Sequence, residues 1–301
     1  AGPIERGSKL APQIEEGKRT TWDAFRDGTW LITKGLFKKA VIADNLAPVV
    51  ASVFQQSEPT AAQVMIGIYA FAFQIYGDFS GYTDIARGVG RMLGYDLMLN
   101  FRLPYFATNP SDFWQRWHIS LSSWLRDYLY IPLGGNRGGT LLTQRNLMLT
   151  MILGGLWHGA AWTFVLWGVF HGLLLTAHRT LAVACRWSPK TMTMTYPFRV
   201  IGMFHLTCFG WLLFRANSVG QVGDMLSSLV SVDFSLSLAD QQNAWKLVLL
   251  CAPLVILQAG QEYTKNLNFI PSLSILPRSI IYSATVMALL ALGSFGQQQF
   301  I

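Results

Sequence analysis

The sequence predicts an all-α fold, a polytopic bundle of transmembrane helices. Only 13% of its 301 residues are charged and 51% are hydrophobic, whereas soluble domains carry about 25% charged residues. The charges are also unevenly spread, because five runs contain no Asp, Glu, Lys or Arg: 61–77, 146–178, 200–214, 247–261 and 279–301. A helix needs about 20 apolar residues to cross a bilayer core roughly 30 Å thick. We therefore expect these runs to supply the spans of a multi-pass membrane protein.

The charge balance fits a membrane protein better than a nucleic-acid-binding one. The net charge is +7 and the pI is near 9.4. The basic residues fall between the apolar runs and do not form a single face, as the positive-inside tendency expects. We expect the lipid bilayer as a partner and no nucleic acid. The three cysteines show no disulfide or metal-site spacing and are expected to pack as small hydrophobes; they are Cys185, Cys208 and Cys251.

The first elements are less clear as membrane spans. Residues 1–28 are polar and are expected to form a surface segment with short helices. Residues 30–54 are apolar but interrupted by charged side chains, which favours an interfacial or re-entrant helix over a simple span. The basic side chains in this segment are Lys34, Lys38 and Lys39. Residues 61–77 then predict the first clear span.

Residues 109–132 predict one amphipathic helix that lies along the membrane surface. Asn109 suits the N-cap and Pro110 suits the first turn, while Pro132 ends the pattern. Apolar side chains occupy one half of the helical wheel and polar ones the other half, so the helix is not expected to cross the bilayer. His118 falls in the apolar half, where an imidazole is unexpected.

The run 146–178 is too long for one span, because its 33 residues would extend about 50 Å as a helix. We expect it to break at Gly154-Gly155 or at Gly159, with His158 at the break. The two resulting segments are predicted over 146–157 and 161–178.

The remaining spans are expected near 198–215 and within the last two uncharged runs. No internal repeat separates the chain into parts. We therefore expect residues 1–301 to form a single membrane-embedded domain.

His158 and His118 are the strongest candidates for catalysis. An ionisable group at membrane depth usually faces a bundle interior or a cavity. Burial keeps an imidazole neutral, and a neutral imidazole accepts a proton from a hydroxyl. The structural alternatives are a His158 bonded to a carbonyl freed by the helix break, and a His118 that reaches toward the lipid headgroups. The other three histidines are interpreted as packing or interface residues: His171, His178 and His205.

Four further residues are candidate substrate contacts: Trp117, Trp157, Trp162 and Asp84. The tryptophans flank the two histidines, and Trp157 and Trp162 are expected to enclose His158. For Asp84 the alternative to lining a site is a place at the start of a new helix, paired with Arg87.

Three blocks of the sequence carry a family resemblance: QIYGDFSGYTDIARGVGRMLGYDLMLNFRLPYF, DFWQRWHISLSSWLRDYLYIPLGGNRGG and RNLMLTMILGGLWHGAAWTFVLWGVFHG. They resemble the signature blocks of the membrane-bound O-acyltransferase (MBOAT) family, in particular its bacterial alginate O-acetyltransferase branch. The blocks cover about residues 74–172, which we take as the signature catalytic region, and AGPIER at the start resembles the preceding block. The order and spacing of WHIS and WHGAAW make the resemblance specific.

The resemblance implies a helical bundle around a central funnel, with re-entrant or interfacial helices. It assigns the family's catalytic histidine to His158 and its second catalytic position to His118. The implied reaction moves an acetyl group from a cytoplasmic thioester, acetyl-CoA or an acyl carrier, which is a substrate and not a bound cofactor. The implied acceptor is an exported, alginate-like polysaccharide, reached directly or through a periplasmic acetyltransferase partner. The implied location is the bacterial inner membrane, and the family's N-terminal helices are expected to be missing from this chain.

Three alternatives remain open. D-alanyl transfer to teichoic acid uses the same fold, but the block DYLYIPLGGNRGG favours the acetylating branch. A transporter with discontinuous helices and a midplane site predicts internal inverted repeats, which we do not find in this sequence. A non-catalytic scaffold would leave two tryptophan-flanked histidines without a role.

Overall fold

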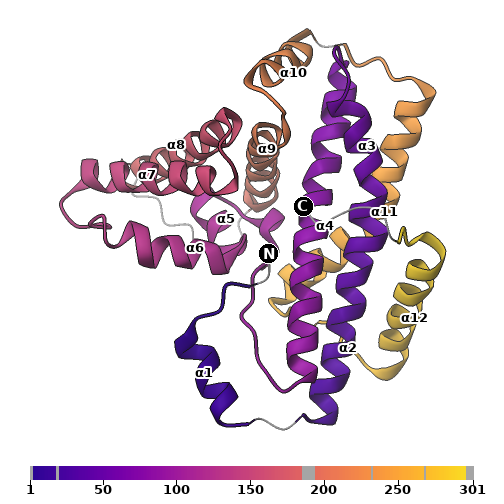
Figure 1. The fold of residues 1–301 in the computed structure, drawn as a ribbon. Coiled ribbons are helices and arrows are strands. Elements are labelled where there is room, and N and C mark those ends of the chain that lie inside the picture. Colours follow the sequence, from indigo (N-terminus) through magenta and orange to yellow (C-terminus); the bar gives the residue numbers. More distant parts are fainter. Residues whose placement is uncertain (1–2, 18–19, 185–193, 232, 268, 296–301) are drawn as a thin grey trace. The chain divides into compact units, whose positions relative to one another are not determined.

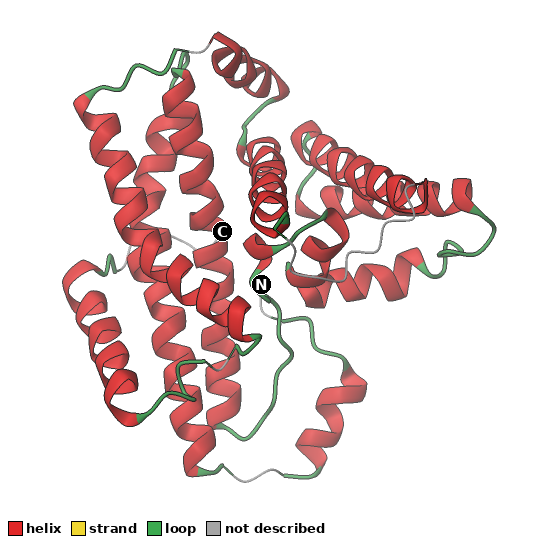
Figure 2. Ribbon diagram, turned by 180° about the vertical axis from the view of Figure 1, so that it is seen from behind, coloured by secondary structure: helices red, strands yellow, loops and turns green. Residues whose placement is uncertain are grey.

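A computed structural model describes residues 3–17, 20–184, 194–231, 233–267 and 269–295. Every regular element in these ranges is a helix, as Figure 1 and Figure 2 show. This confirms the predicted all-α class. The chain forms two compact units: residues 1–57, 62–100 and 234–301 belong to unit 1, and residues 58–61 and 101–233 belong to unit 2. The expectation of a single domain stays a prediction.

Unit 1 contains the longest helices. Its elements are α1 (Gly7–Glu15), α2 (Trp22–Leu36), the π-helix η1 (Phe37–Ala43), α3 (Asp44–Phe54), most of α4 (Ala61–Met92), α11 (Leu238–Thr264) and α12 (Ile275–Leu292). The helices α2, η1 and α3 follow one another directly, so residues 22–54 form one helical path with a π-helical middle. π-helical segments inside α-helices are uncommon and often lie at functional sites.

The backbones of α2 and α4 touch at two levels, where glycine faces glycine. A Cβ atom at Gly35 would lie 2.6 Å from the carbonyl oxygen of Gly81, and one at Gly28 would lie 2.7 Å from that of Gly88. Both glycines of a helix are seven residues apart, so the same helix face makes both contacts. Small residues of this kind allow membrane helices to approach closely, and Figure 1 shows α2 and α4 side by side.

The close approach of α2 and α4 accompanies a buried network of ion pairs. Lys34 Nζ and Lys38 Nζ lie 3.2 and 2.7 Å from the same Asp84 Oδ2. Lys39 Nζ lies 2.8 Å from one carboxylate oxygen each of Asp44 and Asp78. Buried charges are tolerated when they are paired in this way. The lysines therefore give no reason to prefer an interfacial helix, because their charges are neutralised inside the unit.

The course of α4 corrects the expectation for Asp84. The predicted span 61–77 forms the first half of α4, and the helix continues without a break to Met92. Thr83 does not cap a new helix, since its hydroxyl donates to the carbonyl of Phe79 one turn earlier. The prediction that Asp84 lies at the start of another helix is wrong. The lysines that hold Asp84 lie about 50 residues earlier in the chain, and no local pattern around Asp84 indicates them.

Three described helices are long and apolar enough to cross a membrane: α9 (Tyr196–Arg215), α11 and α12. They coincide with the runs predicted at 200–214 and 247–261 and with most of the run 279–301, of which 296–301 lie outside the described residues. Apolar side chains on α12 are exposed, as lipid contact requires; examples are Ile280, Met287 and Leu290. Cys208 and Cys251 are buried as expected, whereas Cys185 lies outside the described residues.

Unit 2 contains the signature histidines. Its elements are η2 (Pro104–Phe106), α5 (Pro110–Arg116), α6 (Ile119–Leu125), the π-helix η3 (Arg126–Tyr130), α7 (Thr140–His158), α8 (Trp162–Ala184), α9 and α10 (Val219–Ser231). The long run breaks where the sequence predicts it, because α7 ends at His158 and Gly159 has a φ of 155° that L side chains rarely adopt. The helices α7 and α8 pack against each other, and α8 also packs on α5 and α9.

The segment 109–132 differs from the prediction. It consists of α5, α6 and η3, and Trp117 and His118 lie between α5 and α6. The prediction of a single surface helix was wrong, because a helical wheel assumes a constant pitch and does not detect a break. The N-cap at Asn109 and the first-turn position of Pro110 are confirmed.

The contact between α2 and α4 yields a testable prediction. Gly81→Ala should lower the free energy of unfolding by about 1–3 kcal/mol, because the new methyl group would press on the Gly35 carbonyl at 2.7 Å. Thermal unfolding of the detergent-solubilised protein measures the change. Gly202→Ala in α9 is the control, since a Cβ atom there has no heavy atom within 4 Å. Equal stability of the two variants would contradict the proposed backbone contact.

Candidate active site

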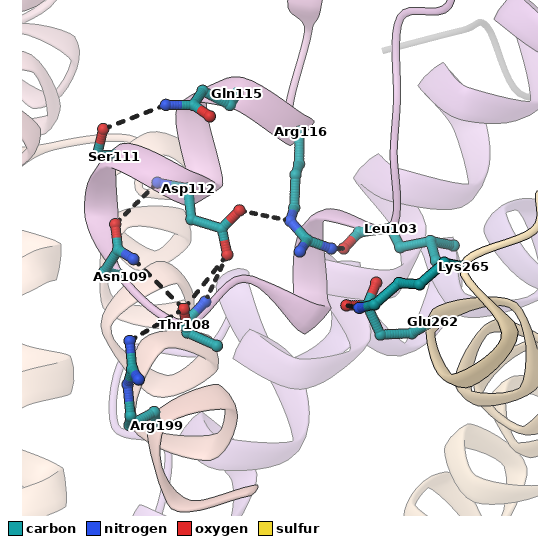
Figure 3. Close-up of polar contacts among 10 residues, drawn as sticks. All are labelled: Leu103, Thr108, Asn109, Ser111, Asp112, Gln115, Arg116, Arg199, Glu262 and Lys265. Atoms are coloured by element: carbon teal, nitrogen blue, oxygen red, sulfur yellow. Dashed lines mark hydrogen bonds and ion pairs between the residues drawn. The ribbon is translucent and has the colours of Figure 1, made fainter. Parts of the chain in front are cut away.

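A polar network fixes the start of α5. The Asn109 side chain accepts a hydrogen bond from the Asp112 N–H at 2.9 Å, and the Asp112 carboxylate accepts one from the Thr108 N–H at 2.9 Å. Asp112 also accepts from Arg116 Nε at 2.7 Å. Arg199 on α9 donates to the Thr108 hydroxyl at 3.3 Å. Figure 3 shows these bonds around Asp112. They join both ends of α5 to the Asp112 carboxylate, and they join Thr108, directly before the N-cap, to α9.

The chain turns sharply directly after α5. His118 has a φ of 43°, in the left-handed region that non-glycine residues seldom occupy. The bonds on either side hold this conformation: Trp117 N–H donates to the Phe113 carbonyl at 2.8 Å, and Ser122 N–H donates to the His118 carbonyl at 2.9 Å. Strained backbone of this kind clusters at functional sites.

The His118 side chain lies inside unit 2. It is 9% exposed, its ring stacks at 6.4 Å on Phe101, and its Nδ1 lies 3.4 Å from the Ser120 hydroxyl. Burial lowers the pKa of His118 well below its ordinary value, and the imidazole of His158 lowers it further. His118 is therefore neutral at pH 7. Its burial does not fit the alternative of a side chain reaching for lipid headgroups.

His158 is the last residue of α7 and is held by aromatic rings on one side. Phe214 from α9 and Trp167 from α8 meet it edge to face, at centroid distances of 5.1 and 5.6 Å. Phe164 completes this wall at 6.3 Å. The rest of the His158 residue is exposed. One side of the imidazole is thus fixed while the other is open to a reactant.

The three tryptophans predicted as substrate contacts differ in exposure: one is buried and two are exposed. Trp117 is 4% exposed and packs on Phe101 and Trp211, at 4.9 and 4.8 Å, so its position favours a packing role. Trp157 is 63% exposed and packs on Trp124 at 5.8 Å, and Trp162 is 76% exposed. The expectation that Trp157 and Trp162 enclose His158 stays a prediction, and in the described residues the rings that contact His158 are those of Phe164, Trp167 and Phe214.

Asp84 belongs to unit 1, whereas both candidate histidines belong to unit 2. Its carboxylate is engaged with Lys34 and Lys38. This pairing is a structural role for Asp84, and its proposed contact with a substrate stays a prediction.

Sequence reasoning missed the residues that do surround His158. Trp167 and Phe214 are the two nearest rings. Trp167 was open to detection, because it follows His158 in the same uncharged run and precedes His171 by one helical turn. Phe214 gave no signal, since it lies on another helix more than 50 residues away and only the fold brings it to the site.

The network around Asp112 yields the next prediction. Asp112→Ala should lower the free energy of unfolding by about 1–3 kcal/mol, because it removes the carboxylate that accepts from the Thr108 N–H and from Arg116 Nε. Thermal unfolding in detergent measures the loss. Gln115→Ala is a matched control on the same helix, since within the described residues Gln115 makes only a 3.5 Å contact with Ser111 at the surface. A loss no larger than in the control would contradict the role of Asp112.

Comparison with known proteins gives a consistent family assignment. Residues 1–219 match the sequence model of MBOAT, the membrane-bound O-acyltransferase family. A probable alginate O-acetylase of Azotobacter vinelandii is 46% identical over 79% of this chain and 46% of its own length. A peptidoglycan O-acetyltransferase of Helicobacter pylori is 40% identical over 77% of this chain and 44% of its own length.

A more distant relative has a different acyl group in its name. The teichoic acid D-alanyltransferase of Bacillus subtilis is 29% identical over 51% of this chain and 41% of its own length. The chain spans about half the length of the curated relatives it matches. The family match over residues 1–219 includes both signature histidines, and on this evidence the chain belongs to the membrane-bound O-acyltransferase family.

Proposed function

We propose that this protein is a membrane O-acyltransferase that moves an acetyl group from a thioester to a hydroxyl. The observation that carries the proposal is a pair of histidines in unit 2, which combines an accessible imidazole at a helix end with a buried one in the same unit. The alternative readings of the sequence lack such support. A transporter or scaffold does not account for the family match or for the left-handed backbone at His118.

In the proposed reaction His158 is the general base. Its neutral imidazole takes the proton from the acceptor hydroxyl while the oxygen attacks the thioester carbonyl. A tetrahedral oxyanion forms and then expels the thiolate, which takes up the proton from the His158 imidazolium. The products are an ester and a free thiol, and the histidine returns to its neutral form. A thioester needs no further activation, so the site has only to remove a proton and stabilise the oxyanion.

In this mechanism His118 orients the acceptor hydroxyl. The ring is neutral and held by its backbone and by Phe101 and Ser120, so it has little freedom to move when the substrate enters. Positioning of a reacting group accounts for several kcal/mol of a catalysed barrier. A second, weakly basic imidazole also does not compete with His158 for the proton.

The substrates follow from the relatives' names and the chemistry. We infer an exported polysaccharide as the acceptor, because two of the relatives are named as probable alginate O-acetylases. We infer acetyl-CoA or an acyl carrier as a cytoplasmic donor, and a periplasmic acetyltransferase partner where the acetyl group is passed on. The place of action would be the bacterial inner membrane. D-alanyl transfer is the weaker candidate, since the D-alanyltransferase relatives share less of the sequence.

Substitution of His158 tests the proposal. His158→Ala and His158→Gln should both lower acetyl transfer by about 10²- to 10⁴-fold, because neither side chain accepts the proton. His118→Ala should lower the rate less, since it removes orientation and leaves the base. Acetyl groups on the polysaccharide are quantified in cells, with the amount of membrane-inserted protein checked by blotting.

His205→Ala is the matched control for a histidine in a membrane helix. Its Nδ1 lies 2.8 Å from the Ile201 carbonyl on the same helix, and the side chain is exposed, so near-normal transfer is expected. Near-normal transfer by His158→Gln would remove the general-base assignment. Acetyl transfer that survives in both His158 variants would sink the proposed site as a whole.

A further inference from the structure

A third histidine in unit 2 has no role in the proposed mechanism. His171 on α8 is 1% exposed. Four rings surround it, at centroid distances between 4.8 and 6.0 Å; they belong to Phe113, Trp114, Trp167 and Phe170. Its Nε2 lies against α9, because a Cβ atom at Gly210 would be 2.8 Å from it. Its buried Nδ1 has no hydrogen-bond partner in the described part of the chain.

Two indole nitrogens beside His171 are in the same situation. Within the described residues, the buried Nε1 atoms of Trp114 and Trp167 also lack a hydrogen-bond partner. The three rings touch one another: the centroids of Trp114 and Trp167 are 5.7 Å apart, and those of Trp114 and Trp167 lie 5.2 and 4.8 Å from His171. Buried polar groups without partners are rare in proteins and costly. Three of them in one cluster point to a shared partner.

The chemistry of the three nitrogens is complementary to one water molecule. An indole N–H only donates, and an unprotonated imidazole nitrogen accepts. A water that accepts from both indoles and donates to His171 Nδ1 has three partners, which is the usual number for buried water. Such a water fixes the proton of His171 on Nε2. The nearly complete burial of His171 and Trp167 argues against contact with a polysaccharide or a thioester.

We propose that Trp114, Trp167 and His171 hold a buried water molecule and that this centre fixes the Trp167 ring against His158. Trp167 is the link, since it contacts His171 on one side and His158 at 5.6 Å, with an interplanar angle of 84°, on the other. His171 is then a positioning residue that acts through Trp167. The effect on catalysis rests on the proposed function, because it assumes that His158 is the base.

Two substitutions at His171 separate the polar centre from simple packing. His171→Phe keeps a ring in the aromatic cage but removes the nitrogen. His171→Asn places an amide oxygen near the position of Nδ1 but leaves space in the cage. If His171 only fills space in the aromatic cage, His171→Phe should retain more acetyl transfer than His171→Asn. If the His171 nitrogen holds the water, His171→Asn should retain more.

The measurements are kcat and KM for acetyl transfer by the full-length protein in membranes, together with the reaction rate of His158 with diethylpyrocarbonate, followed by mass spectrometry. We expect His171→Phe to lower kcat by about 10- to 100-fold with an unchanged KM, as misplacement of a catalytic group does, and to change the labelling rate of His158. We expect His171→Asn to retain most of both values. Wild-type values in His171→Phe, or equal losses in the two variants, would overturn the proposal.

Two further arms keep the test decisive. If His171→Phe fails to fold, Trp114→Phe removes one indole donor and leaves His171 in place. A lowered kcat in the folded Trp114→Phe variant supports the centre, and an unchanged kcat overturns it. If the wild-type protein transfers no acetyl group, the proposed function fails. The rates at which His158 reacts with diethylpyrocarbonate in the wild type and in the variants then still decide whether the centre positions this side chain.

Discussion

The backbone contact between α7 and α8 determines where the candidate site lies. A Cβ atom at Gly155 would lie 2.2 Å from the Phe164 carbonyl oxygen, and one at Gly168 would lie 2.5 Å from that of Met151. No larger residue fits at either position without separating the helices. Because the helices run this close, the end of α7 lies beside the first turns of α8, and His158 reaches Trp167. Without this contact, His158 on α7 and Trp167 on α8 would have no fixed position relative to each other.

Unit 1 also depends on a close contact between two helix backbones, and there the contact is combined with buried ion pairs. Glycines hold α2 against α4, and the lysines of the α2–η1 segment find Asp78 and Asp84 within this contact. The two features depend on each other, since a buried ammonium group without a nearby carboxylate would be strongly destabilising. A network of this kind also fixes the register of two helices, because sliding one helix by a turn would leave charges unpaired. Van der Waals packing alone does not have this specificity.

The sequence was sufficient for features that depend on local chemistry. The helical class, the break at Gly159 and the cap at Asn109 follow from composition, from the conformational freedom of glycine and from the hydrogen bonding of an asparagine side chain. It was insufficient where distant residues decide. The left-handed backbone at His118 is held by bonds that span the break, and an imidazole does not signal such a conformation. The Lys38 side chain is buried because its ammonium group pairs with Asp84, which lies 46 residues later in the chain.

The candidate site was predictable in its histidines and not in their surroundings. Spacing and family resemblance indicate His158 and His118, and the structure brings both into unit 2. The wall around His158 comes from Trp167 and Phe214, whereas the neighbouring Trp157 points outward. Residues adjacent in sequence at a helix end point in different directions, about 100° apart for each step along an α-helix. Adjacency to a catalytic residue is therefore poor evidence of contact with it.

Three of the five histidines of unit 2 illustrate how burial gives one residue type different roles. His158 is exposed, His118 is 9% exposed and His171 is 1% exposed. An accessible imidazole can exchange a proton with a substrate and with solvent, which a general base must do. A deeply buried imidazole is a weaker base because burial disfavours its charged form, but it offers a fixed acceptor or donor, and this suits orientation. Environment separates the roles of chemically identical groups in the same way at other catalytic sites. The exposure of His158 and the burial of His118 and His171 thus agree with the roles proposed for them, although exposure alone does not make a base, since His205 is exposed as well.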